Sequence, residues 1–204
     1  MWYRCGEPYR LDPDSMENLG KSTYFPKDGI SAHAKVDEAT GELLFFNYTT
    51  EAPFMHYGVV SPDEKLVHYV DIPLSAPKLP HDMCFSENYS ILSDLATQFD
   101  EKLLKQGKFK NRTSRKPCRF AVIPRYGQSS EVRFFEVKTT FVLHFLNAYE
   151  KVNEKGEEVI VMDGYRQCMY DGGPNPNSPK NNTAWKKEVD EKVSKYRNSD
   201  ILYR

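Results

Sequence analysis

The sequence predicts an all-β protein. Short apolar stretches, often alternating with polar residues, are separated by turn-forming residues over most of the 204-residue chain. Aromatic residues, which favour strands, make up 13% of the composition. Three segments that begin with a histidine repeat the same order of strand, turn and return strand. Many short strands joined by turns are typical of sandwiches, barrels and propellers.

The expected strands follow one another as hairpins. The segment 31–48, SAHAKVDEATGELLFFNY, predicts two strands that reverse direction at DEATGE. FMHYGVV and LVHYVDI, within residues 54–72, predict a second pair joined by SPDEK. A short strand is expected earlier, at Tyr9–Leu11. Further strands are expected within 118–127, 131–137, 140–150 and 157–165.

Two short helices are expected to interrupt the strands. One is predicted over Ser93–Gly107 and one over Trp185–Tyr196. A Pro-, Gly- and Asn-rich loop begins at residue 171, so we expect a loop and helix excursion over 171–200 within one domain of residues 1–204. The last residues, DILYR, begin a strand whose edge would be unpaired, so we expect this domain to be incomplete.

Composition excludes some classes of protein. The 28 basic residues are balanced by 29 acidic ones, which gives no support to nucleic-acid binding by the whole protein. The four cysteines form no C-x-x-C pair and are expected to be buried free thiols in a reducing compartment. No apolar run approaches the roughly 20 residues of a spanning helix, and no signal peptide is visible at the start. We therefore expect a cytoplasmic protein, soluble or peripheral to a membrane.

Three of the five histidines share a local context. His33, His81 and His144 each precede a few strand residues, a turn and an apolar return strand, at steps of 48 and 63 residues. These steps are close to the roughly 40–50 residues of a propeller blade with its loops. Equivalent residues of successive blades point at one axis, where neutral imidazoles form a metal site suited to Zn(II) or Fe(II). His56 and His68 lie within hairpin arms and are expected to be exposed or packing residues.

Seven segments together resemble the carotenoid cleavage oxygenase family. They are PYRLDPDSMENLG, SAHAKVDEATGELLFFNY, APFMHYGVV, LPHDMCFSENYSIL, CRFAVIPRYG, VRFFEV and VLHFLNAYE, in the family's order over about residues 2–166. The resemblance implies a partial seven-bladed β-propeller, with about three to four central blades in this chain. It also implies an Fe(II) ion on the axis, bound by four histidines. Three of these ligands correspond to His33, His81 and His144, and no histidine of this sequence supplies the fourth.

The resemblance implies an outer layer of residues as well. In the family, glutamates accept hydrogen bonds from the ring N–H groups of three ligands, which orients the rings. The first of these positions falls on Arg4, which cannot accept the bond, although Glu7 is nearby. Asp82 follows His81 and fits either a residue that orients a ligand or a turn cap, of which the turn cap is favoured. Glu150 is expected to be structural.

The implied partners are O2 and a lipophilic polyene or stilbene-like molecule. Aromatic residues near the ligand strands are expected to line an apolar tunnel: Tyr48, Phe54, Phe85 and Phe145. Eight Lys or Arg residues within 102–119 predict a solvated loop or contact with anionic lipid headgroups. In the family, an apolar patch after the second ligand docks on membranes. The candidates for it here are Leu103, Leu104 and Phe109.

Three functions fit these observations. The first is an Fe(II)-dependent dioxygenase that cleaves a C=C bond of a carotenoid, apocarotenoid or stilbene-like substrate. The second is a catalytically inactive propeller fragment that serves as a binding module. The third is a zinc hydrolase in which His33, His81 and His144 hold the metal.

Overall fold

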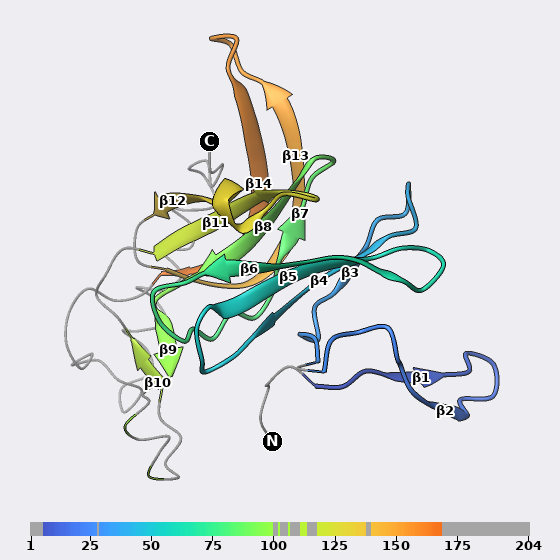
Figure 1. Cartoon of the computed structure of the whole chain (residues 1–204). Helices are drawn as coiled ribbons and strands as arrows, with labels where there is room; N and C mark the ends of the chain where they lie inside the picture. Colours follow the sequence, from blue (N-terminus) through green and yellow to red (C-terminus); the bar gives the residue numbers. More distant parts are fainter. Residues whose placement is uncertain are drawn as a thin grey trace, which may run out of the picture.

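The computed structural model of the chain describes residues 6–27, 29–99, 102, 106, 111–113, 118–137 and 140–168 (Figure 1). Apart from Lys102, which is helical, this part consists of strands β1–β14, one 3-10 turn and loops, which confirms the all-β prediction for nearly all of the described residues. Within the same residues, no helix has the length and apolar character needed to cross a membrane. The expected excursion over 171–200, with its helix at Trp185–Tyr196, lies outside the described residues.

The first sheet is a four-stranded antiparallel meander, as the hairpin pattern predicted. In spatial order it contains β3 (Lys35–Val36), β4 (Leu43–Tyr48), β5 (Phe54–Val60) and β6 (Leu66–Pro73). The predicted reversal DEATGE forms the β3–β4 turn, where Gly41 adopts a φ of 73° that glycine tolerates best.

The second sheet has four antiparallel strands as well. In spatial order it contains β12 (Arg133–Val137), β11 (Cys118–Pro124), β8 (Tyr89–Asp94) and β7 (Cys84–Phe85). Between β8 and β11 the chain forms a small ladder of β9 (Thr97–Phe99) with β10 (Asn111–Thr113). The turn η1 (Ser129–Glu131) precedes β12.

The helix predicted over Ser93–Gly107 is wrong in its described first half. Ser93 and Asp94 end β8, and Thr97–Phe99 form β9. The error has a physical cause, because every residue of Ser90–Asp94 is buried and the alternation that marks a strand is absent. Short apolar runs of this kind do not distinguish a buried strand from a buried helix.

The second sheet is buried on both faces. On one face, Leu92, Ala121 and Ile123 join a core cluster with side chains of β4, β5 and β6. On the other face, Ile91 and Phe120 join a second cluster with side chains of β13 and β14. Successive strand residues point to opposite faces, so β8 and β11 contribute to both cores by simple alternation. The two sheets therefore pack face to face.

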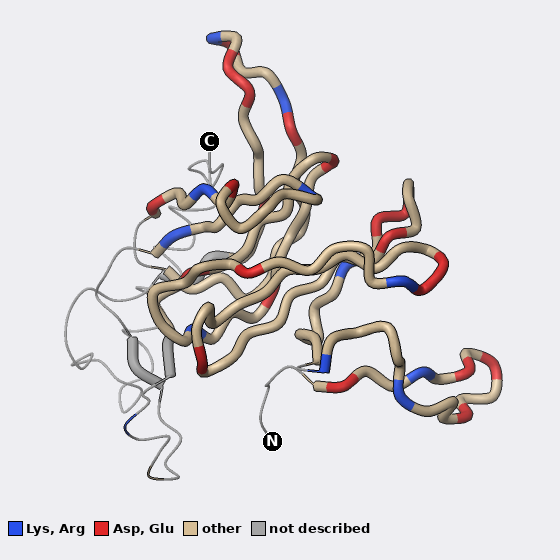
Figure 2. Tube along the Cα trace, viewed as in Figure 1, with Lys and Arg blue, Asp and Glu red and all other residues tan. Residues whose placement is uncertain are grey.

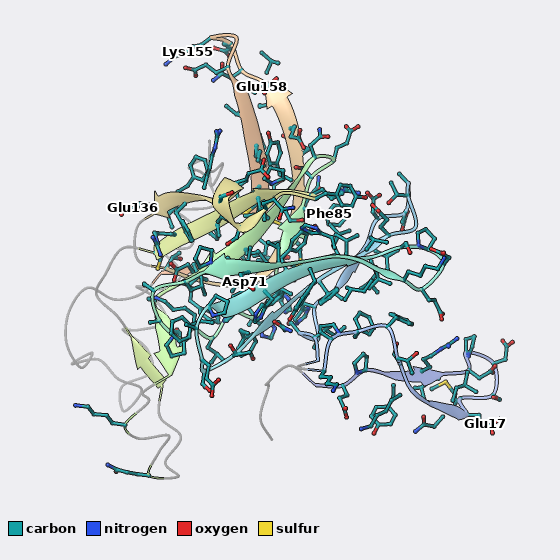
Figure 3. The ribbon with its side chains drawn as sticks, viewed as in Figure 1. Glu17, Asp71, Phe85, Glu136, Lys155 and Glu158 are labelled. Atoms are coloured by element: carbon teal, nitrogen blue, oxygen red, sulfur yellow. The ribbon has the colours of Figure 1, made fainter. Side chains whose placement is uncertain are left out.

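Two hairpins complete the described part. β1 (Tyr9–Leu11) pairs with β2 (Asn18–Lys21), and β13 (Thr140–Val152) pairs with β14 (Glu158–Cys168). Both project from the sheets in Figure 1, and Figure 3 shows a charged residue, Lys155, at the free end of the longer hairpin. Acidic and basic residues are mixed along the chain in Figure 2. Cys84 and Cys118 are free and buried, as predicted for these two thiols.

Candidate metal centre

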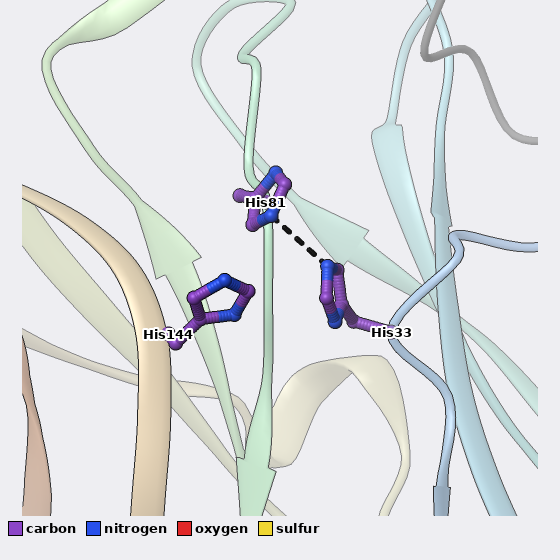
Figure 4. Close-up of side chains that lie close together, drawn as sticks. All are labelled: His33, His81 and His144. Carbon is purple, nitrogen blue, oxygen red and sulfur yellow. Dashed lines mark hydrogen bonds between the residues drawn. The ribbon is translucent and has the colours of Figure 1, made fainter.

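Three imidazole rings converge where the segments before the two sheets meet β13 (Figure 4). The Nε2 atoms of His33 and His81 are 2.9 Å apart. The ring centroid of His144 lies 4.9 Å from that of His33 and 5.0 Å from that of His81. One nitrogen from each ring can be chosen so that all three lie within 4.8 Å of one another. The structure thus brings together the three residues predicted as ligands.

Two of the three histidines occupy similar places relative to their strands, and the third lies inside a strand. His33 lies in the turn just before β3, and His81 lies just before β7. His144 lies within β13, where the pairing with β14 shifts register between Val142 and Phe145. Such bulges redirect a side chain out of the regular alternation of a strand. Gly164 of β14 pairs with Phe145. A Cβ added to Gly164 would lie only 3.1 Å from the carbonyl oxygen of His144, so a glycine here lets the two strands approach closely.

Two rings of the cluster, His33 and His81, favour the neutral form. Burial lowers the pKa of His33 below its ordinary value of 6.5, although the nearby Asp82 carboxylate opposes the shift. Burial lowers the pKa of His81 as well, and the two neighbouring imidazoles add to the effect. Neutral imidazole is the form that binds a metal ion.

The separation of His33 and His81 fits a shared metal ion. Two nitrogens bound to one ion at about 2.1 Å and at a right angle lie about 3 Å apart. The measured separation of 2.9 Å between Nε2 of His33 and Nε2 of His81 is close to that value. The donor set of three imidazoles suits zinc and ferrous iron alike.

Asp82 lies next to the cluster with its side chain 0% exposed. Its carboxylate accepts hydrogen bonds from the backbone N–H groups of Met83, at 2.8 Å, and Phe145, at 2.9 Å. The ammonium of Lys35 lies 2.8 Å from Oδ1. The hydrogen bond to Met83 is local, as in a turn. The contacts with Phe145 and Lys35 connect Asp82 to β13 and β3. The expected turn cap is therefore only part of what Asp82 contacts, and sequence reasoning missed Lys35 altogether.

The predicted tunnel residues are packed in the two cores. Tyr48 belongs to the first core cluster, and Phe54 and Phe85 pack against it. Figure 3 shows Phe85 among the crowded side chains near β7. Phe145 belongs to the second cluster and contacts Phe120 edge to face. Their role in lining a tunnel stays a prediction.

The remaining predicted candidates have other surroundings. Leu103, Leu104 and Phe109, named for membrane contact, lie outside the described residues, as does Arg4. Glu150 accepts hydrogen bonds from Ser86 and Asn88 in the β7–β8 turn, contacts that agree with a structural role.

The two other histidines pack away from the cluster. His56 lies 2.8 Å from the side-chain oxygen of Asn47 and stacks on Tyr69. His68 contacts Tyr57 and Tyr126 edge to face. Both histidines are partly buried, and these contacts agree with the packing role that their place in one hairpin predicted.

A second polar cluster joins the sheets and had no signal in the sequence. Arg125 follows β11 and donates hydrogen bonds to Asp37, at 2.6 Å, and Glu42, at 3.1 Å, both in or beside the β3–β4 turn. It also donates to the backbone oxygen of Ser86 at 3.0 Å. The hydroxyl of Tyr126 donates to Glu42.

Comparisons with known proteins agree on one family. The model of the family described as RPE65, retinal pigment epithelial membrane protein, matches residues 1–202. The carotenoid 9,10(9',10')-cleavage dioxygenase 1 of Pisum sativum is 36% identical over 160 residues, which cover 72% of this chain. An isoeugenol monooxygenase of Pseudomonas nitroreducens is 30% identical over 152 residues, or 71% of this chain.

A solved structure is similar in fold. The lignostilbene dioxygenase of Pseudomonas brassicacearum superimposes with a TM-score of 0.66 at 30% sequence identity. The match covers 78% of this chain and 34% of that chain. The matched regions cover 29% of the pea dioxygenase and 32% of the monooxygenase, so this chain spans about a third or less of the length of these relatives.

Proposed function

Since the chain belongs to the RPE65, or retinal pigment epithelial membrane protein, family, we propose that it carries part of the active site of a non-haem Fe(II)-dependent dioxygenase. The reaction is the cleavage by O2 of a C=C bond in a carotenoid, apocarotenoid or stilbene-like molecule. The convergence of His33, His81 and His144 is the observation that carries the proposal. The printed names of the relatives, two dioxygenases and a monooxygenase, support the class of reaction.

The choice of iron follows from the chemistry of oxygenation. Zinc suits three imidazole ligands but has no redox chemistry, whereas the relatives are oxygenases by name. His33, His81 and His144 would hold Fe(II), which when bound supplies open positions for O2. The three neutral rings bring no negative charge of their own to the ion.

The proposed architecture is a partial seven-bladed β-propeller. Two four-stranded antiparallel sheets that pack face to face support it, because each has the strand number and order of a blade. His33 and His81 precede the first strand of their sheets, β3 and β7, so both would lie near the axis.

The substrate is proposed to be apolar and conjugated. The carotenoid and stilbene relatives support this class, and the chain's own contribution would be to hold one double bond near the metal while excluding water. Phe54, Phe85 and Phe145 are retained as tunnel candidates. Leu103, Leu104 and Phe109 are retained as candidates for contact with a membrane that supplies the substrate.

An isotope experiment tests the proposal. The chain is loaded with Fe(II) without oxygen and then given oxygen-18 gas with a stilbene or an apocarotenoid. We expect labelled aldehyde products, detected by mass spectrometry, with none from His81→Ala. His56→Gln, outside the cluster, is the matched control and should keep the activity.

Two outcomes would contradict the proposal. One is an iron-loaded chain that converts neither substrate class. The other is hydrolysis of esters by the zinc-loaded chain at a rate that depends on His81, because this would favour the hydrolase.

A further inference from the structure

Asp82 touches all three histidine-bearing segments. It follows His81 directly and accepts the backbone N–H of Phe145, the residue after His144. Its oxygen Oδ1 also lies 2.8 Å from the ammonium of Lys35, two residues after His33. A fully buried carboxylate is costly unless each oxygen is paired, and both oxygens of Asp82 are paired here.

The same carboxylate faces two of the rings. Nδ1 of His144 lies 3.7 Å from Oδ2, and Nδ1 of His33 lies 4.0 Å from Oδ1. These distances are too long for hydrogen bonds, but the attraction between a carboxylate and an N–H dipole acts at this range in a buried site. A negative charge beside Nδ1 favours the tautomer with its proton on Nδ1. Nε2 then carries the lone pair that can bind a metal ion, and in the metal-free chain the Nε2 lone pair of His33 accepts from Nε2–H of His81.

We propose that Asp82 is a positioning residue for the metal centre: it holds the proton of His33 and His144 on Nδ1, so that Nε2 is presented as ligand, and it ties the three segments together. Lys35 balances its charge, so the pair adds little net charge beside the ion. This inference rests on one part of the proposed function, namely that the three histidines are metal ligands.

The first measurement needs no metal. Nitrogen-15 NMR of the histidine rings in the metal-free chain distinguishes the two tautomers, with each ring assigned by a His→Gln variant. We expect His33 and His144 to carry the proton on Nδ1, although the free side chain prefers Nε2. In Asp82→Asn the charge is lost while the size is kept, and both rings should shift toward the Nε2 tautomer.

The second measurement is the affinity for Co(II), whose visible absorption reports the ligand set. Loss of a partner behind metal-bound histidines typically weakens binding by roughly 10–100-fold, and we expect this range for Asp82→Asn. Asp94→Asn is the matched control. Asp94 is also buried and paired, with Lys78 at 3.2 Å and with Arg119, but neither partner belongs to the histidine cluster.

A second variant keeps the test decisive where Asp82→Asn does not fold. Lys35→Met leaves the carboxylate and both amide hydrogen bonds in place and removes only the balancing charge. The carboxylate then acts more strongly on both rings and on the ion, so Co(II) binding should tighten by about 3-fold or more. Unchanged or weaker Co(II) binding by folded Lys35→Met would overturn the electrostatic role.

The outcomes separate this inference from the function it rests on. Asp82→Asn with unchanged tautomers and unchanged Co(II) affinity, but with a lowered melting temperature like that of Asp94→Asn, would show that Asp82 is a structural tether only. A wild-type chain that binds no metal would refute the proposed function. The tautomers of His33 and His144 would then decide the role of Asp82 by themselves.

Discussion

The polar cluster around Arg125, called the Arg125 network below, consists of Arg125, Asp37, Glu42 and Tyr126. It and the histidine cluster both join segments that are distant in sequence, but only the Arg125 network pairs groups of opposite charge. Arg125 is 7% exposed and lies against two carboxylates, so opposite charges satisfy one another. In the histidine cluster, three groups of the same kind face each other, and the His144 side chain is 43% exposed. Apart from the contact between Nε2 of His33 and Nε2 of His81, no described hydrogen bond uses the ring nitrogens of the three residues.

The difference separates a structural junction from a site. A network in which one cation is hydrogen-bonded to two carboxylates stabilises the packing of the sheets and leaves the cation no group to bind. A cluster of three imidazoles that solvent can reach has a use only when another group, such as a metal ion, binds to the ring nitrogens. Perturbing the first should change stability alone, and perturbing the second should change metal binding alone.

The largest expected effect is on stability, from Arg125→Met. Removal of the guanidinium leaves Asp37 and Glu42 without their partner, which costs about 3–5 kcal/mol of unfolding free energy for a buried pair. Urea unfolding measures the loss, and Co(II) affinity of the folded fraction should not change. Arg133→Met on exposed β12 should stay within about 0.5 kcal/mol of wild type. A similar loss of unfolding free energy from Arg125→Met and Arg133→Met would show that the Arg125 network has no special role in stability.

The next effect is on metal binding, from His81→Ala. We expect the affinity for Co(II) to fall by about 100-fold or more, which corresponds to about 2.7 kcal/mol, because one of three ligands is lost. The melting temperature of the metal-free chain should hardly change, because the ring makes no other described hydrogen bond than the contact with His33. An unchanged affinity would show that the rings meet without forming a site.

A smaller effect is expected from Glu150→Gln, and it depends on pH. Burial alone would raise the pKa of Glu150, but hydrogen bonds from Ser86 and Asn88 lower it below its ordinary value of 4.5. A lowered folded pKa means that this stabilisation is present above pH 4.5 and is lost as the pH falls through the folded value. Urea unfolding should give a difference of about 1.5 kcal/mol at pH 7 that shrinks below pH 4.5.

Glu158→Gln serves as the control for that prediction. Its side chain is exposed on the β13–β14 hairpin (Figure 3), so it should show no such pH-dependent difference. A Glu150→Gln difference that stays constant from pH 7 to acid would mean that the charge of Glu150 is irrelevant.

The smallest effect comes from an uncharged junction between the two sheets. The hydroxyl of Tyr57 on β5 lies 2.9 Å from Oγ of Ser90 on β8, and both residues are buried. Tyr57→Phe should cost about 1 kcal/mol of unfolding free energy without changing metal binding. A double-mutant cycle with Ser90→Ala measures the coupling, which should account for most of that cost. A coupling near zero would show that this hydrogen bond does not join the sheets.

Local pattern predicted much of the fold and the identity of the clustered residues. The alternation in FMHYGVV and LVHYVDI located β5 and β6, and the repeated context of the three histidines predicted that they meet. The return strand after His81 was predicted and forms most of β8, but its last residues, Ser93 and Asp94, were assigned to a helix because burial on both faces erased the alternation. The partners of Asp82 and Arg125 were missed because they are distant in sequence: Arg125 and Asp37 are 88 residues apart. No local pattern records which distant side chain completes an ion pair.

Iron content tests the central claim most directly. The chain is reconstituted with Fe(II) in the absence of oxygen, freed of excess metal, and analysed for bound iron beside His33→Ala, His81→Ala and His144→Ala. The account predicts near-stoichiometric iron in the wild-type chain and a large loss in each variant. Iron far below stoichiometric in the wild type, or equal iron in wild type and all three variants, would contradict it.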